Sequence, residues 1–293
     1  MATTRMVTGA INFITPQPQG CLEKPYQLKY EAPDGFPPTN IVSDEHMQRL
    51  ADVRGREAQF SVPRNGFTII KLEDQLSYEE YDNEDLVRKV YFKQVAEAVQ
   101  ELLGASRVQI FEHVASTLGP GSRTVIDSDS CENETQVSQS QRGSRIDVTP
   151  SWAAGLAEHM NELKGIELPS GDLQFVNIWK PLRGPIKDWP LAVCDASTVS
   201  KDDLRESDIV FSDRVVENLL VQHNPKQEWY FISDQTPSEA WVFLQADSNA
   251  SGHLGVPHSS FQRPDSANEG IPRESIEVRA IAYYNNGAID AGN

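Results

Sequence analysis

The sequence lacks the features that mark a membrane or secreted protein. No apolar run approaches the ~20 residues that cross a bilayer, and the first ten residues lack the apolar core of a signal peptide. The three cysteines, Cys21, Cys131 and Cys194, are widely separated and have no metal-binding or redox spacing. We therefore expect free thiols in a reducing compartment and a cytoplasmic protein.

Basic residues are also scarce. Lys and Arg number 26 against 43 Asp and Glu, which gives a formal net charge of −17. A chain this acidic repels phosphate backbones and anionic lipid surfaces, so no nucleic acid or membrane partner is expected. No glycine-rich loop in a strand–turn–helix setting indicates a dinucleotide cofactor. A small molecule is the expected partner, and the sequence leaves the oligomeric state open.

The chain does have the composition and length of a globular protein. It has 293 residues, 39% of them hydrophobic and 24% charged, which suits a single large domain. We expect an extended N-terminal arm at residues 1–45, a helix-and-strand buttress at 46–115, a flexible lid loop at 116–146 and a β-barrel core at 147–293. These boundaries are based on the prolines of the first segment and the small polar residues of the third.

Local patterns predict many short strands after an early helix. Apolar residues recur at helical spacing over 83–103 behind a capping Asn83, and a second helix is expected after 149 with Ser151 as its cap. The β-prone runs lie at 107–113, 173–179, 191–194, 209–211, 215–223, 228–233, 240–246 and 275–284. This order predicts a mainly β (α+β) fold, a jelly roll with helices against one face.

Five phrases stand out between residues 50 and 284. They are DVRGRE…F with NGF at 52–67, FVNIWKPLRGPIKDWPLAVCD at 175–195, HNPKQEWYF at 223–231, PHSSF at 257–261 and PRESIEVRA at 272–280. The ordered set resembles a mainly fungal hydroxylase/desaturase family, which includes gibberellin desaturase and a hydroxylase component of cephamycin biosynthesis. The resemblance implies a double-stranded β-helix (cupin-like) barrel, iron(II) and 2-oxoglutarate as cofactors, and a role in secondary metabolism.

The resemblance also implies a metal site, and this sequence departs from it. In the family, a His-x-Asp pair and a later histidine hold one face of the iron. The carboxylate is Asp147 and the later histidine is His258, while Arg273-x-Ser275 would bind the distal carboxylate of 2-oxoglutarate. The position of the first histidine is Arg145. Because arginine stays protonated and has no lone pair for a metal, we expect it to form a salt bridge with Asp147.

A second departure led to the main hypothesis. Gln227 stands where family members commonly carry a histidine. Two missing histidines favour a site that has lost its metal, uses no cofactor and catalyses a redox-neutral reaction. That reaction would be a cyclisation (pericyclic, Diels–Alder-type) or an isomerisation of a small natural-product intermediate. Arg145, Asp147 and His258 would be catalytic, and the substrate-binding residues would be Asn177, Trp179, Trp229, Tyr230, Arg273 and Ser275.

Two alternatives stay open. The chain is a working iron(II)/2-oxoglutarate-dependent hydroxylase or desaturase with an atypical first ligand, its metal held by Asp147, His258 and His223. Or it is a non-catalytic small-molecule binding protein that uses the same pocket. Structural roles compete with each assignment, since a histidine at a strand end often caps that end and tryptophans often belong to the core. The sequence does not indicate the substrate.

Overall fold

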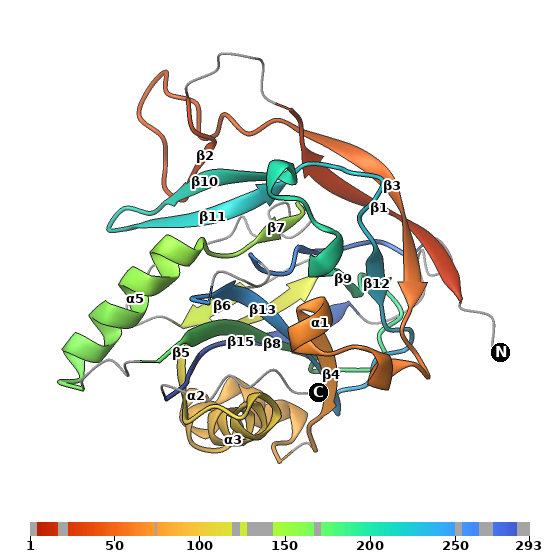
Figure 1. Cartoon of the computed structure of the whole chain (residues 1–293), viewed down its shortest axis with the longest axis vertical. Helices are drawn as coiled ribbons and strands as arrows, with labels where there is room; N and C mark the ends of the chain where they lie inside the picture. The colour runs from red at the N-terminus through yellow and green to blue at the C-terminus, as the bar shows by residue number, and fades with distance from the viewer. Residues whose placement is uncertain are drawn as a thin grey trace.

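Two β-sheets face each other, and helices cover the outer side of the smaller one (Figure 1). The computed structural model describes residues 5–16, 23–73, 75–118, 124–127, 143–166, 171–249, 254–263 and 272–285. The sheets are ordered β1-β3-β12-β9-β14-β7-β11-β10-β2 and β4-β13-β8-β15-β5-β6. This arrangement confirms the predicted mainly β fold with flanking helices.

The strands agree with most of the predicted β-prone runs. The larger sheet contains Met6–Ile14 (β1), Tyr26–Leu28 (β2), Ser43–Asp52 (β3), Arg145–Ile146 (β7), Leu191–Cys194 (β9), Leu204–Val210 (β10), Val215–Val221 (β11), Trp229–Phe231 (β12) and His258–Ser260 (β14). The smaller sheet contains Phe67–Lys71 (β4), Arg107–Leu118 (β5), Thr124–Asp127 (β6), Leu173–Pro181 (β8), Glu239–Asp247 (β13) and Arg273–Tyr283 (β15).

The larger sheet curls back on itself. Its edge strand β1 pairs with β3 in antiparallel register, and Asn12 of β1 also bridges to Gly143, just ahead of β7. The curl encloses an apolar cluster that includes Ile11, Phe13, Leu219, Trp229 and Phe261. The segment predicted as an extended arm contains β1, β2 and the start of β3, and β1 is bridged to the residue just ahead of the strand that leads to Asp147.

The predicted helix over 83–103 is present as three joined pieces. They are α2 (Glu84–Leu86), a π-helical stretch (Val87–Tyr91) and α3 (Phe92–Leu103). The side-chain oxygen of Asn83 accepts a hydrogen bond from the backbone N–H of Leu86 at 3.3 Å, as a cap should. Gly104, with φ 64°, ends the helix in the left-handed conformation that glycine tolerates. The buried Val95 and Val99 pack against the smaller sheet.

The second predicted helix is α5 (Pro150–Leu163), and its cap differs from the prediction. Thr149, not Ser151, is the N-cap: its hydroxyl accepts a hydrogen bond from the backbone N–H of Trp152 at 3.2 Å. The reason is Pro150, which is favoured at the first helical position because its missing N–H is not needed there. Within the described ranges, the other short helices are α1 (Val62–Asn65) and four 3₁₀ turns at Glu57–Gln59, Tyr78–Asp82, Ala196–Thr198 and Lys201–Asp203.

Several sequence predictions lie partly or wholly outside the described residues. Of the lid loop predicted at 116–146, residues 119–123 and 128–142 lie outside the described residues, so the mobility of this loop stays a prediction. Cys21 and Cys131 also lie outside, whereas Cys194 is buried with a free thiol. No helix in the described part of the chain is long and apolar enough to cross a membrane.

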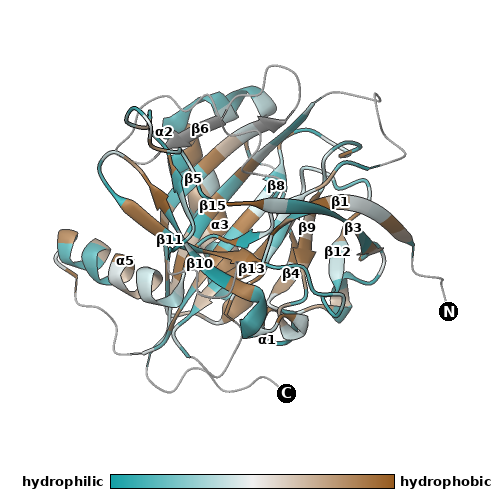
Figure 2. Ribbon diagram, turned by 90° about the horizontal axis from the view of Figure 1, so that it is seen from above, coloured by the Kyte–Doolittle hydropathy of each residue, from teal (hydrophilic) through white to brown (hydrophobic). Residues whose placement is uncertain are grey.

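The alternation of hydrophilic and hydrophobic residues along β15 places polar side chains on the face of the candidate site. Hydrophilic and hydrophobic residues alternate along much of β5 and β15 (Figure 2). Neighbouring strand residues point to opposite faces of a sheet. On one face Ile276, Val278 and Ala280 join the core beneath α3. The other face looks toward the larger sheet and carries Arg273, Ser275, Glu277 and Arg279.

Candidate functional site

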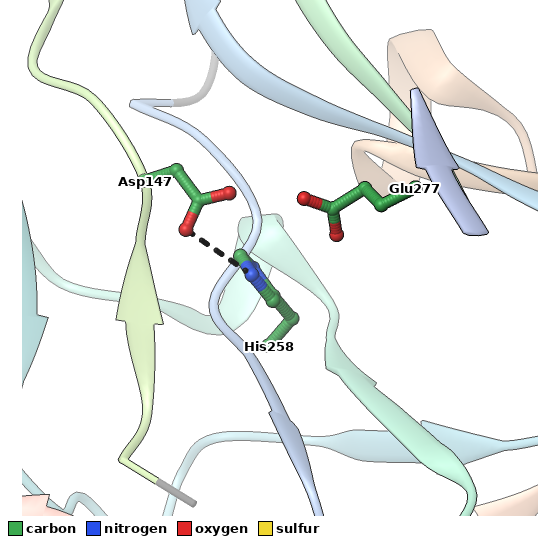
Figure 3. Close-up of side chains that lie close together, drawn as sticks. All are labelled: Asp147, His258 and Glu277. Atoms are coloured by element: carbon green, nitrogen blue, oxygen red, sulfur yellow. Dashed lines mark ion pairs between the residues drawn. The ribbon is translucent and has the colours of Figure 1, made fainter. Parts of the chain in front are cut away.

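The candidate site lies between the two sheets and draws on strands that are far apart in the sequence. Asp147 follows β7, and the register pairs Arg145 of that strand with His258 of β14. Across the gap, Arg279 of β15 lies opposite Asn177 of β8. The carboxylates of Asp147 and Glu277 point toward the His258 ring from two sides (Figure 3).

The Asp147 carboxylate is buried, 6% exposed, and tightly held. One oxygen, Oδ1, accepts a hydrogen bond from Arg145 Nε at 3.0 Å. The other, Oδ2, accepts from Asn177 Nδ2 at 2.8 Å and from Arg279 Nη2 at 3.0 Å. The backbone N–H of Asp147 donates to Gln245 Oε1 at 2.6 Å. The salt bridge that the sequence led us to expect between Arg145 and Asp147 is therefore present.

These contacts fix the charge of Asp147. Burial alone would raise the pKa of its carboxyl group. The positive charges of Arg279 and Arg145, with the nearby imidazole of His258, outweigh burial and hold that pKa well below its usual value. The side chain is therefore an anion at neutral pH, as a metal ligand or an electrostatic stabiliser must be.

His258 presents one nitrogen to Asp147. Its ring is 3% exposed and packs on Phe243, with the ring centroids 5.0 Å apart. Nδ1 lies 3.2 Å from the carbonyl oxygen of Val256, and because a carbonyl only accepts, Nδ1 must donate there. Nε2 lies 3.5 Å from Asp147 Oδ1 and has no hydrogen-bond partner among the described residues. In the neutral ring two lone pairs thus face each other, an arrangement that a proton or a cation between them stabilises.

Arg279 links Asp147 to two further carboxylates. Its Nη1 donates to Glu112 Oε2 at 2.5 Å, and its Nε donates to Glu277 Oε1 at 3.1 Å. Burial opposes the charge of this guanidinium, but Asp147, Glu112 and Glu277 raise its pKa well above the usual value. Ligand atoms of Asp147, His258 and Glu277 all lie within 4.8 Å of one another. In the described part of the chain these three residues form the one group with this potential to hold a metal ion.

Arg273 and Ser275 lie on the same strand face as Glu277. Arg273 is 6% exposed, donates from Nη1 to the carbonyl of Trp189 at 2.9 Å, and lies 5.2 Å from the ring centroid of Trp179. Burial lowers its pKa to about 9, although Glu277 and Asp188 act against that shift. The hydroxyl of Ser275 lies 3.2 Å from that of Ser116.

Two predicted site residues do not reach this site. On β12, Tyr230 pairs with Val193, which pairs with His258, so these three share a face. The adjacent Trp229 must point the other way, and it packs against Phe13 inside the curl, 5.8 Å between ring centroids. Trp229 therefore lies outside the face that Tyr230 and His258 share, because two neighbours on one strand cannot both line the same face, and its role in substrate binding stays a prediction.

The alternative third metal ligand, His223, is also elsewhere. Its ring stacks on His46 at a centroid distance of 4.1 Å and contacts Phe13 at 5.2 Å. Gln227, whose missing imidazole suggested a changed site, is buried and donates to Asp203 Oδ2 at 3.3 Å and to the carbonyl of Gln222 at 3.0 Å. Neither position belongs to the Asp147 cluster, so the second missing histidine says nothing about the metal.

The sequence reasoning missed Glu277, Arg279, Glu112 and Gln245. A signal for the first two was present. Once Arg273 and Ser275 are placed on one strand face, the period of two puts Glu277 and Arg279 on that face as well. Glu112 and Gln245 carried no comparable signal, because their contacts depend on how β5 and β13 align with other strands.

The chain is similar to known proteins along most of its length. It matches the family model described as "Oxidoreductase/YMDC permease-like domain" over residues 11–283. It is 28% identical over 247 residues to hydroxylase/desaturase efuI of Hormonema carpetanum, covering 80% of this chain and 82% of that protein. It is 29% identical over 274 residues to alpha-ketoglutarate-dependent dioxygenase phiK of a fungal species, covering 88% and 95%.

A solved structure shows the same fold. The iron and alpha-ketoglutarate-dependent endoperoxidase NvfI superposes with a TM-score of 0.79 at 24% identity, covering 96% of this chain and 99% of the other. The predicted double-stranded β-helix of the iron(II)/2-oxoglutarate oxygenases is thereby confirmed. The metal triad of that fold is only partly present here, because Asp147 and His258 are retained while Arg145 occupies the remaining position.

Proposed function

Because this chain belongs to the oxidoreductase/YMDC permease-like family, and within it to the fungal hydroxylases and desaturases, we propose that it is an iron(II)/2-oxoglutarate-dependent tailoring oxygenase of secondary metabolism. This is the atypical-metal-site alternative raised by the sequence. The contacts of the described residues favour it over loss of the metal.

The observation that carries the proposal is the buried Nε2 of His258. It has no hydrogen-bond partner among the described residues and faces an ionised carboxylate across 3.5 Å. An unsatisfied buried nitrogen costs about 1–3 kcal/mol, and a divalent cation shared with Asp147 would satisfy it. Imidazole nitrogen and carboxylate oxygen are donors that iron(II) accepts. With 2-oxoglutarate and dioxygen, iron(II) would supply oxidative C–H chemistry.

The charge balance of the site favours binding of the metal and 2-oxoglutarate together. Carboxylates and guanidinium groups nearly balance among the described residues here: Asp147, Glu112, Glu277 and Asp188 stand against Arg145, Arg273 and Arg279. Iron(II) and dianionic 2-oxoglutarate sum to zero charge. The pair adds no uncompensated charge to a buried space, whereas either component alone would.

Different residues of this chain would then bind the metal, orient its ligand and bind 2-oxoglutarate. Asp147 and His258 would hold the metal, and Asn177 and Arg279 would keep the Asp147 carboxylate oriented. Arg273 carries a planar pair of donors suited to a carboxylate. Apolar rings beside these polar groups, Trp179 and Phe243 among them, make a surface typical of small-molecule sites. The substrate we propose is a small natural-product intermediate.

A second candidate function has one observation in its favour. Arg145 and Arg279 already neutralise Asp147, each from 3.0 Å, so the anion needs no metal for its stability. In that case the site would catalyse a metal-independent cyclisation or isomerisation. Arg145 would then polarise a substrate carbonyl by hydrogen bonding, and tight binding would hold the reacting carbons in contact.

One experiment separates the two functions. The intermediate that accumulates in a gene-deletion strain is supplied to purified protein, with and without iron(II), 2-oxoglutarate and oxygen. We expect turnover only with all three, succinate release, and a product that has gained oxygen or lost hydrogen. Unchanged turnover in anaerobic buffer with a chelator would refute the oxygenase and support the isomerase. Tight binding of the intermediate without any turnover would refute both and leave the non-catalytic alternative.

A further inference from the structure

We propose that Glu277 of β15 is the third protein ligand of the metal, in place of the histidine that Arg145 replaces. The inference rests on the proposed function. It makes the site a set of one histidine and two carboxylates drawn from three strands, with Glu277 far from the usual position in the sequence.

The geometry of Glu277 suits this role. Its ligand atom lies within 4.8 Å of those of Asp147 and His258, and its carboxylate points to the same place (Figure 3). Arg279 contacts Oε1 of Glu277, from both Nε and Nη2 at 3.1 Å. Oε2 of Glu277 has no hydrogen-bond partner among the described residues and is left for a metal, while Arg279 holds the carboxylate in place as hydrogen-bonded neighbours of metal ligands do.

The neighbouring charges explain why a carboxylate can replace an imidazole here. Exchanging a neutral histidine for Glu277 adds one negative charge to the site. Arginine at position 145 adds one positive charge, 3.0 Å from Asp147, so the sum is unchanged. Arg145 itself has no lone pair for a metal, but it offsets the charge that the new ligand brings.

The donor set also indicates the class of ion. Two carboxylates and one imidazole are harder donors than two imidazoles and one carboxylate. Such a set suits iron(II) or manganese(II) rather than softer or more strongly imidazole-preferring ions. His258 supplies the second, independent observation, because its buried Nε2 faces into the cluster without a hydrogen-bond partner among the described residues.

The test measures metal binding and does not depend on turnover. The full chain is stripped of metal, supplied with 2-oxoglutarate and titrated anaerobically with cobalt(II), followed by visible absorption and calorimetry. For Glu277→Gln we expect affinity to fall by more than the roughly 10–100-fold that follows loss of a second-shell partner. Glu274→Gln is the matched control, since Glu274 lies on the opposite face of the same strand and bonds Tyr78; its affinity should equal that of the wild type.

A rescue variant separates ligation from misfolding. In Arg145→His/Glu277→Gln, an imidazole returns at the family's position, and we expect most of the lost affinity to return. If wild-type protein binds no cobalt(II) or iron(II), the proposed function itself fails. If the wild type binds and Glu277→Gln binds equally well while His258→Ala does not, the oxygenase stands and the assignment of Glu277 is overturned. Loss in Glu277→Gln without rescue, in a folded protein by circular dichroism, also overturns it.

Discussion

Arg279 is the residue whose removal should most disturb the charges between the sheets. It contacts Asp147, Glu112 and Glu277 at distances of 3.0, 2.5 and 3.1 Å. Methionine has a similar length and no charge, so Arg279→Met removes the guanidinium with little change in packing volume. Three carboxylates then remain together, and Arg145 stays in contact with one of them, Asp147.

The burial of these groups sets how much the free energy of unfolding should fall in Arg279→Met. Removing one partner of a buried ion pair costs about 3–5 kcal/mol, because the remaining charge stays in a poorly solvated place. The Arg279 side chain is 23% exposed and that of Glu112 is 18% exposed, so water relieves part of this cost. We therefore expect the free energy of unfolding at pH 7 to fall by about 3 kcal/mol, the lower end of that range.

The loss should depend on pH in a definite direction. In the wild type the lowered pKa of Asp147 stabilises the fold above the unfolded-state pKa, and this contribution disappears as pH falls through the folded value. In the variant this contribution is smaller, because Arg279 is the strongest of the charges that lower that pKa. The difference in the free energy of unfolding between the two proteins should therefore shrink as pH falls below 3.8, the ordinary value for that carboxyl group.

Urea denaturation followed by fluorescence of the five tryptophans measures both effects. Arg88→Met is the control, since Arg88 is 45% exposed and pairs with Glu84 on a helix surface; it should cost no more than about 0.5 kcal/mol. A loss in Arg279→Met below about 1 kcal/mol, or a loss that is the same well below pH 3.8 as at pH 7, would refute the reasoning.

Three further predictions concern other parts of the fold. Burial, and then the nearby charge of Arg88, lower the pKa of His113 to about 4. Below pH 6.5 the unfolded chain therefore takes up a proton at this residue that the folded protein does not, and the free energy of unfolding falls. Between pH 6.5 and 5, the free energy of unfolding of His113→Leu in urea melts should fall by on the order of 1 kcal/mol less than that of the wild type. Gly9→Ala places a methyl group 2.3 Å from the ring of Phe261 and should cost about 1–3 kcal/mol, visible as a lower melting temperature. Burial raises the pKa of the Cys194 thiol, so mass spectrometry should find this residue unalkylated by iodoacetamide in native protein and alkylated in urea.

The fold was predictable where local pattern decides it. The helix behind Asn83 and the strands at 173–181, 191–194 and 239–247 lie where the sequence indicated, with ends within two residues of those predicted. Strands β1, β3 and β4 were not predicted. The β3 segment, SDEHMQRLAD, is mostly polar, and β4 has only five residues, so neither gives a clear alternating pattern on its own. Their place is set by pairing with β1 and β13, which local sequence does not specify. The N-cap of α5 shows the same limit at shorter range, since Pro150 shifted the helix start by its backbone chemistry.

Only those site residues that share one strand or one short sequence segment could be predicted. Asp147 and His258 were identified from their phrases and do meet, and the Arg145 salt bridge followed from the shared strand face. The partners of Asp147 across the gap depend on the alignment of two sheets, which local sequence does not specify. Trp229 lies on the opposite face of β12 from Tyr230, an alternation that the period of two along a strand would have indicated.

The position of β15 has a consequence for the order in which the protein is made. This strand is the last one described along the chain, yet it lies in the middle of the smaller sheet, between β8 and β5. On the ribosome, β5 and β8 emerge with their facing edges open, and Glu112 is synthesised long before Arg279. Such non-local pairing folds slowly and leaves strand edges exposed for association with other chains. A nascent chain therefore has no assembled cation site, and the carboxylates stay hydrated until β15 inserts. Insertion of one strand completes the sheet and neutralises the site in the same step.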